Sequence, residues 1–523
     1  MQVSAKKNVV VFILLMFVLF YSCSDYNKKP HKDISEASIN AGELLAKKYC
    51  QSCHLLPAPS LLNTESWVKG VLPNMGPRLG IFNFKWESYP SLRYDKNVPR
   101  NFYPSQPLLT DNEWQDIINY YTASSPDTLP PQHRTMPIEI RKDLFAVSMP
   151  PFFKPAPNTC YIKVDTTTIP HTILQSDVFT KEIIRYDTGL KIIDSIKAAS
   201  AMVDIDFKNK TMVTCNIGVL NPNNGSFGKL QYVIKDAAGK MHIDTTFHIN
   251  NLQRPVQLIK TDLNKDGLDD YLVCEFGYVT GSLNWYENKG KNIFTKHVLR
   301  AVPGAIKAYV KDYNNDGLPD IFVLFAQGDE GIFLFTNKGN GQFDQKTLLR
   351  FPPSYGSSYF ELDDFNKDGL PDILYTCGDN ADFSPVFKPY HGVYIFMNDG
   401  KYNFTQIYFF PINGCYKAMA ADFNNDGNLD IAAISFFADY TKQPEEGFVY
   451  LKNIGGLNFK PYSVPEAMNG HWLTMDVGDI YGNGKKSILL GNFSRAPSNL
   501  KRKVDWKDGP PFLILNKTSS LIK

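Results

Sequence analysis

Two cysteines and a histidine near the start of the chain form a compact motif with cofactor-binding chemistry. They lie in residues 48–54 (KYCQSCH), where Cys50 and Cys53 are followed directly by His54. Two thiols on one helical turn can both reach the vinyl groups of one haem, and the next histidine then faces the iron. A zinc site would need a second ligand pair, and a thioredoxin-like dithiol would need a βαβ context. Neither is present in the sequence, so we predict one covalent haem c, attached through both cysteines, with His54 as an axial ligand.

A second set of ligand-type side chains recurs in a nine-residue pattern that begins at Asp262, Asp312, Asp364 and Asp422. Carboxylate or amide oxygens stand at positions 1, 3, 5 and 9, and position 7 can offer a backbone carbonyl. Glycine at position 6 permits a sharp turn. Hard cations prefer such oxygen ligands, so the sequence predicts about four Ca²⁺ sites. The expected ligands are Asp262, Asn264, Asp266, Leu268 and Asp270; Asp312, Asn314, Asp316, Leu318 and Asp320; Asp364, Asn366, Asp368, Leu370 and Asp372; and Asp422, Asn424, Asp426, Asn428 and Asp430.

This acidic loop resembles an EF-hand loop but differs from it in two respects. Position 12 lacks glutamate, and the flanking segments alternate as β-strands do. The loop is therefore predicted to join two strands. The alternative is a set of Asp-Gly turns without metal, but the recurrence of every ligand position favours a cation.

Helical patterns flank the Cys-x-x-Cys-His motif. Residues 41–49 have the pattern of a helix that enters the motif. Thr110 and Glu113 form a capping box for a second helix, whose apolar residues recur at i, i+3, i+4 and i+7. These features resemble class I cytochrome c over about residues 39–125, in which the first and last helices cross beside the haem. The resemblance implies a small all-α domain.

The resemblance also implies a second axial ligand of the iron. Met75 stands between proline and glycine in residues 72–77 (LPNMGP), as the distal methionine of the family does. An ordinary core methionine is the alternative. His31 precedes the first helix, which argues against ligation by two histidines.

The acidic patterns begin 50, 52 and 58 residues apart, a period that suits a four-stranded propeller blade with long loops. Each repeat continues with a strand that ends in an asparagine-containing turn, often followed by a strand that begins with phenylalanine. This organisation is similar to FG-GAP/VCBS-type β-propellers and covers about residues 157–519. It implies an all-β propeller of about seven blades. Cys215, Cys274 and Cys377 fall at matching positions in second strands, where buried free thiols are expected.

The acidic loops should all lie on one face of the propeller, because each joins the first and second strands of a blade. The turns on the opposite face are long, and loops on rigid scaffolds commonly carry function. The possible ligand-binding residues on that side are Arg254, Lys417, His471, Trp472 and Arg495. The alternative is that these groups only fill and cap the central channel.

The first residues have the pattern of a targeting signal. Lys6 and Lys7 precede a short apolar run that ends before Cys23, so residues 1–22 are predicted to be a signal peptide. A small residue before the cysteine resembles a bacterial lipoprotein signal, which implies lipidation of Cys23 and attachment to a membrane of the cell envelope. Residues 23–38 are expected to be a tether, and residues 126–156, which are rich in proline, a linker.

The 523 residues contain 55 Lys+Arg and 53 Asp+Glu, so there is no basic field for nucleic acid. The combined features predict a multidomain envelope protein that carries electrons through one haem, with a calcium-bound propeller as a binding or docking module. No catalytic residue is assigned. Expected partners are an unidentified redox protein and a carbohydrate or protein ligand of the propeller. The alternatives are a propeller sugar or alcohol dehydrogenase that reduces its own haem, and a carbohydrate-binding or lyase propeller.

Overall fold

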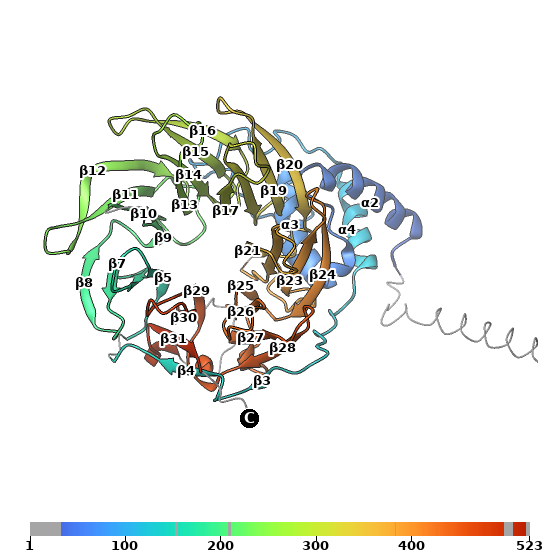
Figure 1. The fold of residues 1–523 in the computed structure, drawn as a ribbon. Coiled ribbons are helices and arrows are strands. Elements are labelled where there is room, and N and C mark those ends of the chain that lie inside the picture. The colour runs from blue at the N-terminus through green and yellow to red at the C-terminus, as the bar shows by residue number, and fades with distance from the viewer. Residues whose placement is uncertain (1–32, 152–154, 208–210, 382, 496–505, 519–523) are drawn as a thin grey trace, which may run out of the picture.

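The computed structural model describes residues 33–151, 155–207, 211–381, 383–495 and 506–518. These residues form a ring of seven β-sheets around a central axis, which is a seven-bladed β-propeller (Figure 1). A helical unit, residues 33–125, lies against one side of the ring. The prediction of about seven blades is confirmed.

Blades 1 to 4 are meanders in which consecutive strands pair. Blade 1 contains β5 (Thr159–Asp165), β6 (Thr172–Asp177), β7 (Glu182–Tyr186) and β8 (Ile192–Lys197). Blade 2 contains β9 (Met202–Asp206), β10 (Thr211–Asn216), β11 (Gly228–Lys235) and β12 (Met241–Leu252). Blade 3 contains β13 (Pro255–Thr261), β14 (Asp270–Glu275), β15 (Ser282–Asn288) and β16 (Phe294–Arg300). Blade 4 contains β17 (Ala305–Lys311), β18 (Asp320–Phe325), β19 (Gly331–Asn337) and β20 (Phe343–Arg350).

The last three blades complete the ring, and two of them also take a strand from the start of the chain. Blade 5 contains β21 (Ser357–Asp363), β22 (Asp372–Cys377), β23 (Gly392–Asn398) and β24 (Phe404–Pro411). Blade 6 contains β25 (Cys415–Ala421), β26 (Asp430–Ser435), β27 (Phe448–Asn453), β28 (Phe459–Ser463) and β3 (Glu139–Ile140). Blade 7 contains β29 (Trp472–Gly478), β30 (Ser487–Asn492), β31 (Phe512–Lys517) and β4 (Phe145–Ser148).

The second strand of each blade is buried along both of its faces, because neighbouring blades pack against it from either side. In β18, β22 and β26 all six residues are buried. This two-sided burial explains the nearly continuous apolar runs that follow each acidic loop. Cys215, Cys274 and Cys377 are buried free thiols in such strands, as predicted.

The predicted linker is an ordered strap, here defined as residues 126–148, that runs past the outer strands of blades 5 and 6 (Figure 1). Its strand β3 pairs in parallel with β28, and β4 forms the outermost strand of blade 7 beside β31. The strap therefore closes the ring by joining the start of the propeller to its end, and it is a structural part of the propeller rather than a spacer.

Closure of the propeller ring should depend on Phe145. This residue is 3% exposed, and its ring packs edge-on against Phe448 and Tyr450 of blade 6. We expect Phe145→Ala to lower the free energy of unfolding by about 3–5 kcal/mol, through lost burial and the cavity left behind. Ile140→Ala, on the neighbouring β3 where the side chain is 45% exposed, is the matched control and should cost far less. Urea denaturation followed by tryptophan fluorescence measures both variants, and equal losses would contradict the role of Phe145 in closure.

The helical unit consists of two long helices and several short turns. The long helices are α2 (Glu36–Tyr49) and α4 (Asp111–Ser124). Between them lie the short helical segments η1 (Cys50–Ser52), η2 (Pro59–Leu61), η3 (Ser66–Val71), α3 (Leu72–Met75) and η4 (Gly76–Leu79). A two-stranded hairpin follows, made of β1 (Asn83–Phe84) and β2 (Glu87–Ser88), so the unit is not all-α as predicted. Three further 3₁₀ segments lie in the propeller: η5 (Pro444–Gly447), η6 (Pro465–Asn469) and η7 (Trp506–Asp508).

The two long helices cross in close contact at Gly42. A Cβ atom at this position would lie 2.0 Å from the backbone oxygen of Asp116, so only glycine fits. Thr110 caps α4, and the Glu113 carboxylate accepts the Thr110 backbone N–H at 2.8 Å, which confirms the predicted capping box. In the apolar core of the unit, the rings of Trp67 and Tyr121 pack with their centres 4.3 Å apart and their planes tilted by 40°. The crossing fixes the end of α2, where the Cys-x-x-Cys-His motif begins.

Candidate functional site

The Cys-x-x-Cys-His motif follows α2 directly and turns the chain into a single 3₁₀ segment, η1. Cys50 is half-buried against the apolar core, whereas Cys53 is exposed, and both are free thiols. Burial raises the pKa of the Cys50 thiol to about 11, with a smaller contribution from Cys53. The thiol of Cys50 is therefore protonated at neutral pH, and both sulfurs lie within one turn of chain. This donor set fits a haem attached at two points.

The half-buried imidazole of His54 is held in place by a hydrogen bond between its Nδ1 and the backbone oxygen of Leu55, at 2.9 Å. Because a carbonyl only accepts, Nδ1 carries the proton and Nε2 keeps its lone pair. Burial lowers the pKa of His54, which favours the neutral ring that metals bind. The histidine is thus in the tautomer required for ligation through Nε2.

Met75 ends the short helix α3 and is half-buried, so it lies in a helical turn. The following residue, Gly76, packs closely against the ring of Tyr89. Cys23 and His31 lie outside the described residues. Among the described residues, no helix combines the length and apolar character needed to cross a bilayer.

The helical unit docks on the propeller face that lies opposite the acidic loops. Tyr390 of blade 5 donates to the backbone oxygen of Leu61 at 3.0 Å, and Val386 packs against the apolar core of the unit. Asn224 of blade 2 donates to Asp95 at 2.9 Å. Contacts at blades 2 and 5 mean that the unit bridges this face. The long turns that the sequence singled out as a ligand face therefore bind, in part, another segment of the same chain.

The strap also bonds to the blade 5 loop on which the helical unit docks. Gln132 donates to the backbone oxygens of Lys388 and His391, at 3.1 and 2.8 Å, in the same blade 5 loop that contacts the helical unit. Arg134 pairs with the buried carboxylate of Glu446. The helical unit, the strap and the blade 5 loop are thus joined by direct hydrogen bonds.

The four acidic loops share one geometry, seen in the loop that begins at Asp262. The two carboxylate oxygens of Asp262 accept the backbone N–H groups of Asp266 and Gly267, at 3.2 and 2.9 Å. Asn264 donates to Asp266 at 3.0 Å. The same bonds recur in the other three loops, so oxygens of positions 1, 3 and 5 gather in a single turn.

The position 9 aspartates have a different environment. Asp270 is fully buried, and its oxygens accept the backbone N–H groups of Leu263 and Asn288, at 3.1 and 2.8 Å. Burial raises the pKa of the equivalent Asp320, and the nearby charges of Asp316 and Asp312 raise it further. This aspartate therefore ties its loop to the third strand and also faces like charge. Among the described residues, no group of three or more His, Cys, Asp or Glu side chains converges as a metal cluster.

A fifth loop, which begins at Asp479, keeps the backbone pattern without the acidic set. Asp479 accepts the N–H groups of Asn483 and Gly484, at 3.1 and 2.7 Å. Positions 3 and 9 are tyrosine and serine in this loop. The turn itself can therefore form without the additional acids. Formation of the turn does not explain why the other four loops contain them.

The five residues predicted for a ligand face are dispersed. His471 and Trp472 are fully buried, so neither can form part of a ligand-binding face. The ring of His471 is sandwiched between Phe436 and Trp506, at 4.0 and 4.6 Å, and both of its nitrogens contact backbone oxygens.

Arg254 is also buried, and it donates to the backbone oxygens of Gly277 and Leu220. Lys417 lies on the innermost strand β25, where its ammonium donates to the backbone oxygen of Met475 at 2.8 Å. Arg495 is exposed, with its guanidinium over the ring of Phe179 at 5.4 Å. Only Lys417 and Arg495 remain available to a ligand, and they come from different blades.

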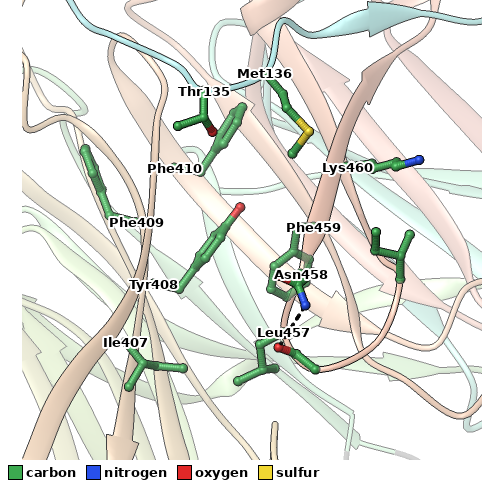
Figure 2. A pocket seen from close by; sticks show the side chains of 12 residues that line it. Thr135, Met136, Ile407, Tyr408, Phe409, Phe410, Leu457, Asn458, Phe459 and Lys460 are labelled. Atoms are coloured by element: carbon green, nitrogen blue, oxygen red, sulfur yellow. Dashed lines mark hydrogen bonds between the residues drawn. The ribbon is translucent and has the colours of Figure 1, made fainter.

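A groove of about 650 Å³ lies at the rim of the propeller between blades 5 and 6 (Figure 2). Tyr408 and Phe410 of β24 line one side, Phe459 of β28 lines the other, and Met136 of the strap lies at its edge. No convergent set of charged groups lines it. No local sequence pattern marks this groove, because its walls come from strands β24 and β28 and from the strap, which are separate segments of the chain.

Sequence comparison supports the repeat assignment. The family model described as FG-GAP-like repeat matches residues 262–323 and 312–375, which span the first three acidic loops. A curated relative, described as a T-cell immunomodulatory protein homolog from Plasmodium falciparum (isolate 3D7), is 30% identical over 169 residues. That match covers 28% of this chain and 22% of the relative's length.

Solved structures resemble the ring with little sequence identity. Sqt1 from Saccharomyces cerevisiae has a TM-score of 0.44 at 9% identity, with 72% of this chain and 100% of that chain covered. BBS1N, solved in complex with ARL6DN, has a TM-score of 0.41 at 9% identity, with 73% and 99% covered. From the matched repeats and the seven sheets, the chain is a seven-bladed β-propeller protein that contains FG-GAP-like repeats.

Proposed function

We propose that the protein is an electron carrier of the bacterial cell envelope, with one covalent haem c in the helical unit and a propeller that serves as a docking module. The observation that carries the proposal is the motif at the end of α2, where two free thiols within one turn are followed by an imidazole whose Nδ1 is already engaged. When bound, the haem supplies reversible one-electron chemistry.

The residues of the chain have distinct tasks in this proposal. Cys50 and Cys53 hold the cofactor at two points, and the hydrogen bond to Leu55 orients His54 toward the iron. The apolar core around Trp67 and Tyr121 excludes water from one side of the site. Met75 is proposed as the second axial ligand because it stands between proline and glycine in residues 72–77, as the distal methionine of class I cytochrome c does.

We also propose that the four acidic loops bind Ca²⁺ and that the sites are structural. Each loop offers the side-chain oxygens of positions 1, 3 and 5 within a single turn, beside a buried position 9 carboxylate that faces like charge. Ca²⁺ takes six to eight oxygen ligands, including amides, backbone carbonyls and water. Lipidation at Cys23 and a location on an envelope membrane are proposed from the short apolar run and the cysteine that follows it.

The test separates a carrier from a catalyst. The oxidised protein, produced in a host that attaches haem c, should be reduced rapidly by a small-molecule reductant and reoxidised without loss of its spectrum. A panel of sugars and alcohols, with and without a quinone cofactor, should leave the haem oxidised. Reduction of the haem by one of these compounds would show that the protein is a dehydrogenase and not a carrier. Tight carbohydrate binding by a chain without haem would favour a carbohydrate-binding propeller.

A further inference from the structure

Two charged side chains of blade 4 and one at the end of β16 in blade 3 form a compact group on the face that the helical unit covers. Asp329 lies in the loop between β18 and β19, and its two oxygens pair with Arg300 and Arg350 at 2.6 Å each. We call these three residues the blade 4 charge cluster. Arg300 and Asp329 are mostly buried, with side chains 12% and 18% exposed, and the guanidinium of Arg300 lies 3.8 Å from the ring centre of Phe333. The cluster is therefore held rigidly by both ion pairing and packing.

The cluster lies near the point where the helical unit docks, because the Tyr390 hydroxyl that contacts Leu61 also contacts the backbone oxygen of Ser354, four residues beyond Arg350, at 3.3 Å. The helical unit contacts blade 2 through Asn224 and blade 5 through Tyr390, and blade 4 lies within this span. The charges that act on the His54 imidazole include Asp329 and Arg350 of the propeller as well as Arg78 of its own unit. Since these groups come from segments about 300 residues apart, only the docked arrangement brings them together.

The blade 4 charge cluster carries one more positive charge than negative charge. Two arginines of the cluster share one carboxylate, and Nη1 of Arg300 is buried with no hydrogen-bond partner among the described residues. The next acid along the chain, Glu330, is turned toward blade 5, where it accepts from the Ser357 hydroxyl at 2.6 Å. Buried charged groups are normally paired. An excess of guanidinium suits a cofactor that brings its own carboxylates, as the two propionates of haem do.

We propose that the blade 4 charge cluster forms the propeller's half of the haem site and sets the reduction potential of the iron. This inference rests on the proposed function and goes beyond it, because it assigns the propeller a direct electrostatic role in the redox centre. Ferric iron carries one more positive charge than ferrous iron, so a nearby carboxylate stabilises the oxidised state and a nearby guanidinium stabilises the reduced state. The dry surroundings of Arg300 and Asp329 make such effects larger than at a surface.

The experiment measures the midpoint potential of the full-length haem protein by spectroelectrochemical titration. Asp329→Asn should raise the potential, and Arg350→Gln should lower it. Both changes break the same ion pair, so a purely structural loosening of the docked unit would shift the two potentials in the same direction. Opposite signs therefore identify an electrostatic role.

Two exposed residues on strand β20 provide matched controls. Asp344→Asn and Lys346→Gln change the same charges on the strand that ends at Arg350, with Asp344 about 20 Å away along the strand. Both should leave the potential unchanged. Shifts of equal sign in Asp329→Asn and Arg350→Gln, or no shift in either, would overturn the inference while the haem itself remains. A wild-type chain that carries no covalent haem would overturn the proposed function and this inference with it.

Discussion

Replacing Cys50 and Cys53 together with alanine should leave the chain without any covalently bound haem. The two thiols are the only groups in the motif that can form thioether bonds, and His54 by itself can hold a cofactor only by coordination. Acid extraction of the denatured protein, followed by a pyridine haemochrome spectrum, measures the haem that stays on the chain. We expect a complete loss in the double variant and one haem per chain in the wild type.

Met75→Ala is the matched variant for this experiment, because it changes a proposed iron ligand and leaves both thiols in place. It should keep the covalent haem, lose the spectroscopic signature of methionine–iron coordination and lower the reduction potential, since a thioether ligand raises it. If His31→Ala produces these changes and Met75→Ala does not, the distal ligand is assigned to the wrong residue. Haem that survives the double cysteine change would contradict the attachment site.

Removal of Ca²⁺ should strongly lower the melting temperature of the propeller. An empty acidic loop holds several carboxylates close together, and the buried aspartate at position 9 adds to their mutual repulsion. With calcium near 1 mM and an affinity of ~10⁻⁴ M, each site should stabilise the fold by about 1.4 kcal/mol. Four independent sites would contribute roughly 6 kcal/mol, which is comparable to the whole stability of many domains.

The chelator experiment has controls within the chain. Asp266→Asn removes one carboxylate from one loop and should reduce the calcium response by about a quarter, as expected for four equal sites. Asp344→Asn removes an exposed acid from β20, outside any loop, and should leave the response unchanged. Mg²⁺ should restore little stability, because it requires a smaller octahedral shell. If the chelator does not change the melting curve and elemental analysis finds no calcium, the four loops are ordinary turns without metal.

The periodic part of the fold could be predicted from the sequence. Each acidic loop recurs at the spacing of a blade, and the strand after it is apolar on both faces, so blades 3 to 6 follow from local patterns. The closing strand could not be found in this way. Phe145–Ser148 has only four residues, and its partner β31 lies near the other end of the chain. Such a long-range pairing leaves no periodic signal in the segment itself.

The residues of the candidate haem motif were also evident locally, because their chemistry depends on spacing along one turn. The blade 4 charge cluster was not, since Arg300, Asp329 and Arg350 resemble ordinary surface charges until the helical unit docks above them. His471 and Trp472 failed as ligand-face candidates for a related reason. Polar aromatic groups at the start of an inner strand can face the channel or be buried, and packing against Trp506 and Phe436 decided this case.

The ring closure at blade 7 also imposes an order on biosynthesis. Strand β4 leaves the ribosome roughly 360 residues before its partner β31, so at 5–20 residues per second the last blade stays incomplete for roughly 20–70 s. During that interval the edge of β4 has no native partner strand, although Phe145 can already pack against Phe448 and Tyr450 once blade 6 is made. A chain truncated before residue 512 would keep this edge unpaired permanently, so nonsense mutations even near the C-terminus should yield insoluble or rapidly degraded protein rather than a shortened propeller.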